Sequence, residues 1–295
     1  LGAGDHVVLQ QTLYGGTYNL INEEFSKYGI EYSFTSGWNA DAFEAEIKAN
    51  TKVIYIETPS NPLLTITDLE AIAALAKKHG LITMIDNTFD SPVNQNPTDF
   101  GIDIVIHSAT KYMGGHSDIC AGAVASTTEN MDRIFQLAKN FGGSLSDYTV
   151  WLLERSMKTM GIRVKAQNEN ALAMAIFLDG LEEVEKVYYP GLPTHIDHDI
   201  AKNQMKGYGG MLSFELNEKL DSSKFQKALN LIKPSMSLAG VESTVLSPTQ
   251  TSHALMSAEV RAEQGISDGL IRFSLGIEEI EDLKNDIQQA LNFIK

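Results

Sequence analysis

Residues 102–111 read IDIVIHSATK and join a run of apolar, mostly β-branched residues directly to a polar segment that ends in a lysine. Two other runs have the same character: residues 52–56 (KVIYI) and residues 81–85 (LITMI). Unbroken apolar runs of this length are typical of strands that are buried on both faces of a parallel sheet. The three runs therefore predict the central strands of an α/β fold.

The segments around these runs read as helices. Thr67-Asp68-Leu69-Glu70 has the spacing of a capping box, and an apolar helical stripe follows it up to Gly80. Residues 5–9 read as a strand, and the helix-like stretch after Tyr14-Gly15-Gly16-Thr17 stops at Gly29. Strands that alternate with helices favour a mainly parallel sheet with right-handed crossovers.

The pattern changes after about residue 146. A long helix is expected from Thr149 to Asn170 and beyond, residues 211–216 (MLSFEL) and 270–275 (LIRFSL) read as strands, and residues 278–295 as an acidic amphipathic helix. Helices beside a few strands indicate a smaller α+β domain. We therefore predict a large α/β domain over residues 1–153 and a C-terminal α+β domain over residues 154–295.

The composition limits the class of partner. A formal net charge of −15 argues against nucleic acid and against an anionic membrane surface, because both attract basic patches. The sequence has no run of 18 apolar residues, so no membrane span is predicted. His107, His116 and His253 are scattered without paired metal-ligand spacing, so no metal site is predicted. Cys120, the only cysteine, excludes an internal disulfide, fits a reducing cytoplasm and is expected to be a buried thiol.

Polar side chains follow the buried runs. Asp86 comes directly after LITMI, Ser108 and Thr110 follow IDIVI, and Lys111 stands five residues beyond that run. Ligands bind at the carboxyl ends of strands in open parallel sheets, so these side chains are expected to share one crevice. An aldehyde cofactor gives this lysine a role, a carboxylate can pair with a pyridinium nitrogen, and hydroxyls can hold phosphate. The spacing alone leaves open that Asp86 caps a turn and that Lys111 is a surface residue.

Six blocks of the chain resemble the Cys/Met-metabolism family of enzymes that depend on pyridoxal phosphate (PLP). This family includes cystathionine γ-synthase, cystathionine γ-lyase and β-lyase, methionine γ-lyase and the homoserine sulfhydrylases. The blocks follow the family's order over nearly the whole chain: residues 13–18 (LYGGTY), 57–62 (ETPSNP), 86–89 (DNTF), 108–118 (SATKYMGGHSD), 237–243 (SLAGVES) and 265–272 (GISDGLIR). The resemblance implies the aspartate aminotransferase-like fold, fold type I, with PLP bound by the large domain.

The resemblance also implies a cofactor site. Lys111 is expected to hold PLP as a Schiff base and, once displaced, to carry the α proton of the substrate. Tyr14 is expected to stack on the ring and to exchange protons as a second acid and base. Asp86 is expected to bind the ring nitrogen, and Ser108 and Thr110 to bind the phosphate.

The same resemblance implies residues that bind the substrate. Arg272 is expected to grip the substrate carboxylate, a task suited to a bidentate guanidinium. Asn61 is expected near the ring oxygen and that carboxylate, and Ser237 and Thr251 beside the arginine. Taken without its motif, Arg272 reads as a surface charge at the edge of a strand.

Met236, which precedes the 237–243 block, bears on the reaction. The synthases and cystathionine γ-lyases usually have glutamate there, and an apolar residue is more similar to methionine γ-lyase. The β-lyases usually carry a tryptophan where this chain has Leu238 and Ala239, whereas Gly16 stands where methionine γ-lyase typically has cysteine. We expect a C–S lyase that performs α,γ-elimination on methionine or cystathionine, giving 2-oxobutyrate, ammonia and a thiol. The alternative is γ-replacement, as in cystathionine γ-synthase or an O-acylhomoserine sulfhydrylase.

The resemblance further implies a homotetramer with active sites shared between subunits. Family members have residues upstream of the position of Leu1, including a glycine-containing phosphate-binding turn and an arm that reaches a neighbouring subunit's site. The large domain is therefore expected to be incomplete at its N-terminus. A folded core that holds its cofactor poorly and is inactive stays open as a further alternative.

Overall fold

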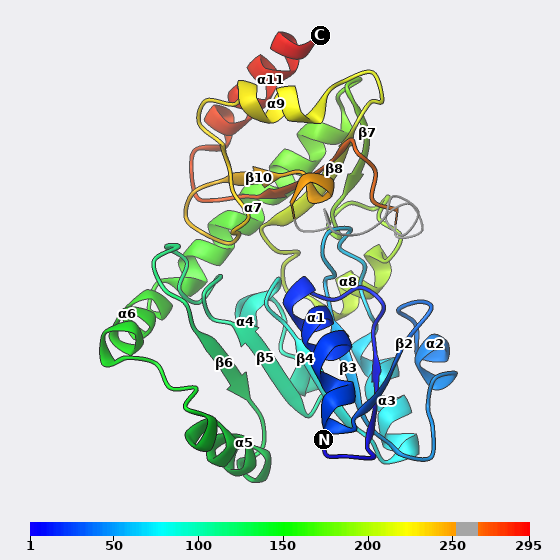
Figure 1. Cartoon of the computed structure of the whole chain (residues 1–295). Helices are drawn as coiled ribbons and strands as arrows, with labels where there is room; N and C mark the ends of the chain where they lie inside the picture. The colour runs from blue at the N-terminus through cyan, green and yellow to red at the C-terminus, as the bar shows by residue number, and fades with distance from the viewer. Residues whose placement is uncertain (252–264) are drawn as a thin grey trace.

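The computed structural model describes residues 1–251 and 265–295. Two β-sheets dominate it, a six-stranded sheet in the lower half of Figure 1 and a five-stranded sheet in the upper half. Within the described residues, every helix is too short or too polar to span a bilayer. The two sheets and the helices around them position the site described below.

The first sheet has the strand order β2-β1-β3-β4-β5-β6. Its first five strands are parallel, whereas β6 runs antiparallel to β5. The three predicted apolar runs form its central strands, so the prediction of a mainly parallel sheet is confirmed. The strands are β1 (His6–Leu9), β2 (Glu31–Phe34), β3 (Thr51–Glu57), β4 (Ile82–Asp86), β5 (Ile104–Ser108) and β6 (Gly122–Ala125).

Helices cover both faces of this sheet. Ile21 of α1 (Gly15–Glu24) packs against Val7 and Val53, and Ile72 of α3 (Leu69–His79) packs on the opposite face. Successive side chains of a strand point to opposite faces, so an unbroken apolar run supplies both packing layers. Shorter helical elements connect these parts: Phe25–Tyr28, α2 (Ala40–Glu44), α4 (Ser91–Asn94) and Pro97–Phe100.

The start of α3 differs from the predicted capping box by one residue. Asp68, not Thr67, is the N-cap, and its carboxylate accepts a hydrogen bond from the Ala71 N–H at 3.0 Å. Thr67 is buried instead, and its hydroxyl donates to the Gln10 side chain at 3.0 Å. Aspartate caps a helix as well as threonine does, so the spacing did not decide between the two neighbours.

The long helix predicted from Thr149 onward is two helices. α6 (Asp147–Met157) and α7 (Met160–Asp179) are separated at Thr159, whose ψ of 1° is not helical. At the break the Ser156 carbonyl accepts hydrogen bonds from the Thr159 N–H at 3.2 Å, from the Thr159 hydroxyl at 3.1 Å and from Arg163 at 2.9 Å. α5 (Thr128–Phe141), which was not predicted, precedes this pair and has no buried residue.

The second sheet has the order β7-β8-β11-β10-β9 and is mostly antiparallel. α7 and the C-terminal helix α11 (Ile280–Ile294) share one apolar core with it, which includes Phe214, Phe273 and Leu283. The remaining elements are β7 (Val184–Tyr188), α8 (His198–Gln204), β8 (Met211–Leu216), α9 (Ser222–Ala228), β9 (Lys233–Pro234), β10 (Thr244–Leu246), Pro248–Gln250 and β11 (Leu270–Ser274). The boundary between residues 153 and 154 stays a prediction, and it lies inside α6.

Cys120 is exposed, so the expectation of a buried thiol was wrong. The residues on either side of it, Ile119 and Ala121, are buried. In an extended segment neighbouring side chains point to opposite sides, which places the Cys120 side chain on the solvent side just before the edge strand β6.

Candidate active site

The predicted site residues of the first sheet lie at one edge. Asp86 is the last residue of β4, Asn61 follows β3, and Lys111 follows β5. The strand arrows in Figure 1 show that the carboxyl ends of the parallel strands point toward the second sheet, where β11 carries Arg272. The fold therefore brings side chains from both halves of the chain to this edge.

Lys111 lies half-buried in the turn after β5. Its backbone N–H donates to the Ser108 carbonyl at 3.0 Å, and its carbonyl accepts from the Gly115 N–H at 2.7 Å. Its amine makes no hydrogen bond or ion pair with any residue in 1–251 or 265–295. Burial, followed by the positive charge of Arg272, lowers the pKa of Lys111. A larger share of this amine is therefore neutral, the form that attacks an aldehyde.

Asp86 is held by Thr88. One carboxylate oxygen, Oδ1, accepts from the Thr88 N–H at 3.0 Å and from the Thr88 hydroxyl at 2.5 Å. The other oxygen has no hydrogen-bond partner among the described residues. Burial raises the pKa of Asp86, and the two bonds from Thr88 oppose this rise because they favour the anion.

Ser108 and Thr110 differ in how their hydroxyls are used. The Thr110 hydroxyl accepts from the Ala121 N–H at 2.9 Å and lies 3.3 Å from the Ala121 carbonyl. The Ser108 N–H donates to the Thr88 hydroxyl at 2.8 Å, and the Ser108 hydroxyl makes no hydrogen bond within the described residues. Of the two predicted phosphate ligands, Ser108 therefore has the more available hydroxyl.

Arg272 is buried and its guanidinium is shared between two acceptors. Nη1 donates to Asn61 Oδ1 at 3.3 Å, and Nη2 donates to the Met236 carbonyl at 3.0 Å. Burial lowers the pKa of Arg272 to about 10. The structure thus joins Asn61, Met236 and Arg272, which were predicted separately, and the reading of Arg272 as an exposed charge does not hold because it is only 5% exposed.

Ser237 and Thr251 do not bind this guanidinium among the described contacts. The Thr251 hydroxyl donates to the Ser247 carbonyl at 2.7 Å, and the Ser237 carbonyl lies 3.3 Å from the Thr244 hydroxyl that donates to it. Their assignment to the substrate stays a prediction. The side chain of Met236 is 66% exposed, so it stands at the surface beside Arg272.

Tyr14 is the N-cap residue of α1 and its side chain is 60% exposed. A Cβ at Gly16 would lie 2.6 Å from Tyr14 Cε1, so the ring occupies the space that a side chain at position 16 would need. The backbone N–H of Tyr14 donates to Glu57 Oε2 at 2.7 Å. Two features therefore set the position of the ring: the hydrogen bond of the Tyr14 N–H, and the lack of a side chain at Gly16.

Arg163 of α7 is a positioning residue that sequence reasoning missed. Its side chain is 4% exposed, and Nη1 and Nη2 donate to the carbonyls of Tyr112 at 2.9 Å and Met113 at 3.3 Å, the two residues after Lys111. A Cβ at Gly115 would lie 1.9 Å from Arg163 Nη1, so this glycine leaves the space for the guanidinium. The signal in the sequence was weak, because an arginine on a helix normally faces solvent.

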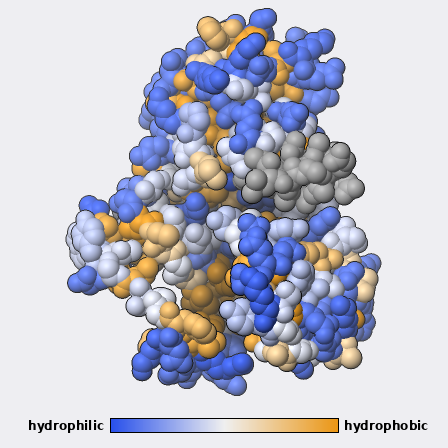
Figure 2. All heavy atoms as spheres, in the orientation of Figure 1, coloured by the Kyte–Doolittle hydropathy of each residue, from blue (hydrophilic) through white to orange (hydrophobic). Residues whose placement is uncertain are grey.

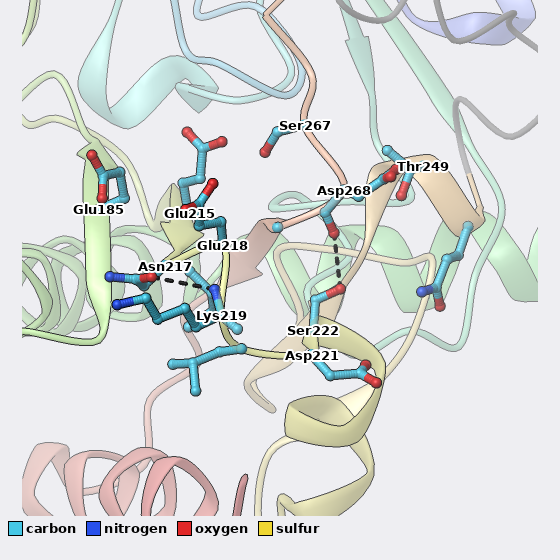
Figure 3. Close-up of a pocket in the computed structure, with 14 residues that line it drawn as sticks. Glu185, Glu215, Asn217, Glu218, Lys219, Asp221, Ser222, Thr249, Ser267 and Asp268 are labelled. Carbon is cyan, nitrogen blue, oxygen red and sulfur yellow. Dashed lines mark hydrogen bonds between the residues drawn. The ribbon is translucent and has the colours of Figure 1, made fainter. Parts of the chain in front are cut away.

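A cavity of about 1030 Å³ lies away from these residues, at the end of β8. Figure 3 shows that Glu185, Glu215 and Glu218 lie on one side of it, while the Ser222 hydroxyl donates to the Asp268 carbonyl at 2.9 Å on the other. None of the predicted site residues lines it. A second cavity, of about 280 Å³, is lined by Asn61 and therefore adjoins the site.

Comparisons with known proteins agree with this geometry. The family model for Cys/Met metabolism PLP-dependent enzymes matches residues 1–292. A cystathionine β-lyase of Lactococcus lactis subsp. cremoris is 46% identical over 290 residues, which cover 98% of this chain and 76% of that protein. A cystathionine γ-lyase of Bacillus subtilis is 45% identical over 293 residues, 99% of this chain and 77% of that protein.

A solved structure extends the likeness to the fold. The crystal structure of cystathionine γ-lyase from Lactobacillus plantarum complexed with L-serine has a TM-score of 0.96 and 41% sequence identity, and covers 100% of this chain and 77% of that chain. The predictions of fold type I, of PLP as cofactor and of an enzyme are confirmed. On the match over nearly its whole length, the chain belongs to the Cys/Met metabolism family of PLP-dependent enzymes.

Proposed function

We propose that this chain is a C–S lyase that acts at the γ carbon of methionine or cystathionine. The observation that carries the proposal is the pair formed by Lys111, an unpaired half-buried amine in the described part of the chain, and Arg272, whose charge lowers its pKa. Such a pair holds an amino acid by its carboxylate beside a reactive amine. Relatives named cystathionine lyases, at 42–46% identity, support a lyase.

The donor set fits PLP. Asp86 offers an unoccupied carboxylate oxygen to a pyridinium nitrogen, Ser108 offers a hydroxyl to the phosphate, and Lys111 offers an amine to the aldehyde. The cofactor supplies a ring that accepts electrons and so makes the α proton of the bound amino acid acidic. All other tasks fall to the side chains of the chain itself.

Two residues move protons in the proposed reaction. Lys111 would accept the α proton of the bound amino acid and is suited to this by its lowered pKa. Elimination at the γ carbon also needs a proton removed from the β carbon and one given to the departing sulfur. Tyr14 is proposed for the transfer to sulfur, because its ring is held over Gly16 at the start of α1.

Substrate choice is assigned to Met236. Its carbonyl holds Arg272, so its side chain stands next to the place proposed for the substrate carboxylate. An exposed apolar side chain suits the thioether of methionine better than the distal ammonium of cystathionine, which favours a carboxylate partner. The balanced reaction is methionine plus water to methanethiol, 2-oxobutyrate and ammonia, and cystathionine yields cysteine in place of methanethiol.

The products decide between the candidate reactions. Purified holoenzyme is incubated with methionine, with cystathionine, and with an O-acylhomoserine plus cysteine, and keto acids and thiols are measured. Release of 2-oxobutyrate with a thiol supports γ-elimination. Cystathionine as the main product would establish γ-replacement, the reaction of a relative named cystathionine γ-synthase from Mycobacterium leprae at 40% identity. Pyruvate and homocysteine from cystathionine would establish β-elimination, and no product with bound PLP would indicate an inactive core.

We also propose that a second copy of the chain covers α5 and α6 in a homotetramer with shared sites. α5 has no buried residue, although apolar side chains line one side of it. Figure 2 shows apolar side chains gathered over α5 and α6, and exposed members include Phe135, Phe141, Tyr148 and Trp151. Patches of this kind mark protein interfaces.

We also propose a cytoplasmic location. The chain has a single cysteine and so forms no internal disulfide, which fits a reducing compartment.

Light scattering coupled to size exclusion tests this assembly. The proposal predicts a tetramer for the wild type and a smaller species for Trp151→Asp, which places a charge in the apolar surface. Ile196→Asp is the control, because Ile196 is also an exposed apolar residue but lies far along the chain, just before α8. A monomeric wild type, or equal masses for Trp151→Asp and the wild type, contradicts the proposal.

A further inference from the structure

Glu57 is a buried carboxyl that stands between two residues of the proposed site. It is the last residue of β3, its side chain is only 4% exposed, and Oε2 accepts from the Tyr14 N–H at 2.7 Å. In the register of the sheet it is paired with Asp86, the last residue of β4. Paired residues on adjacent strands project from the same face, so the two carboxyl groups are neighbours.

Two neighbouring carboxyl groups in a buried place do not both carry charge readily. Asp86 receives two hydrogen bonds from Thr88, whereas Glu57 receives one, from a backbone N–H, and forms no ion pair within the described residues. Burial, and after it the charge of Asp86, raise the pKa of Glu57 well above its ordinary value. Tyr55, which also faces this pair, has its pKa raised by burial and by both carboxyl groups and stays neutral.

The backbone of Glu57 is itself fixed. The Gln10 side chain donates to the Glu57 carbonyl at 2.8 Å and accepts from the Glu57 N–H at 3.3 Å. Gln10 is fully buried and follows β1, the strand that leads to Tyr14. A chain of contacts thus runs from Gln10 through Glu57 to the N–H of Tyr14, whose exposed ring has little packing of its own.

We propose that Glu57 is a positioning residue which works as a neutral carboxylic acid: it fixes the Tyr14 backbone as a hydrogen-bond acceptor and leaves the negative charge on Asp86. The inference rests on the function proposed above, because Tyr14 and Asp86 are assigned to the cofactor there. When the group at position 57 is neutral, Asp86 is the only anion of the pair, and it alone attracts a pyridinium nitrogen. An acceptor at this position would fix the backbone that carries the Tyr14 ring.

Glutamine and leucine at position 57 separate these roles. Glu57→Gln is neutral and keeps an acceptor, whereas Glu57→Leu keeps the bulk and removes the acceptor. In hydrogen exchange of the whole chain, the Tyr14 amide is expected to exchange about tenfold faster in Glu57→Leu than in the wild type, because it loses its partner, and Glu57→Gln restores the protection. Infrared spectra at neutral pH are expected to show a protonated carboxyl band in the wild type that is missing in Glu57→Gln.

The holoenzyme gives the functional readout. Glu57→Leu is expected to lower kcat about tenfold and to weaken the circular dichroism of the bound cofactor, and Glu57→Gln to rescue both. The control Glu31→Leu, an exposed position on β2, leaves all of these signals at wild-type values. Denaturation curves of each variant identify a loss of folding.

The outcomes distinguish this inference from the proposed function. An unchanged infrared carboxyl region in Glu57→Gln, or equal Tyr14 exchange in Glu57→Leu and the wild type, overturns the inference without any use of the cofactor. A Glu57→Gln holoenzyme that behaves like Glu57→Leu also overturns it, because the charge is then required. Expected exchange and infrared results in a protein that binds no PLP would contradict the proposed function and leave the placement of Glu57 intact.

Discussion

Replacing Arg163 with methionine tests how the lysine turn is held. The guanidinium donates to the carbonyls of Tyr112 and Ser156, both at 2.9 Å, and to that of Met113 at 3.3 Å. The Ser156 carbonyl keeps the N–H and the hydroxyl of Thr159 as donors, whereas the Tyr112 carbonyl has no other donor among the described residues. A buried carbonyl that loses its donor costs about 1–3 kcal/mol. Methionine needs no desolvation of a charge, which offsets part of this loss. We expect Arg163→Met to lower the free energy of unfolding by about 2 kcal/mol.

Urea denaturation followed by circular dichroism measures this loss. Arg163→Lys keeps the charge but not the planar fork, and is expected to recover part of the stability. Lys165→Met is the matched control, because Lys165 is an exposed cation on the same helix, and its effect is expected to stay within about 0.5 kcal/mol. A change as small as this in Arg163→Met would refute the role of Arg163 in the turn, since it would mean that the Tyr112 carbonyl needs no donor.

Two further predictions concern the site. Burial raises the pKa of Asp86, and the hydrogen bond from the Thr88 hydroxyl opposes this rise, so Thr88→Val is expected to raise the pKa further. When the pH is lowered, the Asp86 anion proposed to bind the ring nitrogen is therefore protonated at a higher pH than in the wild type. An acid titration of the cofactor's visible absorbance measures the midpoint, and a midpoint at or below that of the wild type contradicts the role of Thr88. Met236→Glu is expected to shift the ratio of kcat/KM values from methionine toward cystathionine by about tenfold, because it adds a carboxylate partner for the distal ammonium. An unchanged ratio would remove position 236 from the account of specificity.

Much of the fold was predictable because local pattern and global packing agree in the first sheet. The runs at 52–56, 81–85 and 102–106 supply side chains to both faces, so no other arrangement buries them as well. Their position also predicted that Asp86 and Lys111 would meet at one edge. The assignment of residue roles came from the resemblance, and the substrate-binding roles of Ser237 and Thr251 stay predictions.

The parts that sequence reasoning missed depend on contacts between distant segments. Nothing local marks Arg163 as buried, since two of its acceptors, the carbonyls of Tyr112 and Met113, lie 51 and 50 residues earlier in the chain. The break between α6 and α7 at Thr159 was missed as well, because no glycine or proline in residues 157–160 marks it. Glu57 stood in a recognised block, but its role depends on the strand register that brings it beside Asp86. β6 is a short edge strand whose pairing is antiparallel, and its sequence carries too little pattern to show this.

All of the proposed chemistry rests on Lys111 as the residue that carries the cofactor. Borohydride reduction of the yellow protein, followed by peptide mass mapping, tests it directly, with Lys111→Ala as the control that is expected to lose the covalent label. We expect one reduced pyridoxyl group, on the peptide that contains Lys111. A label on another lysine, or no label in a protein that has taken up PLP, would contradict it.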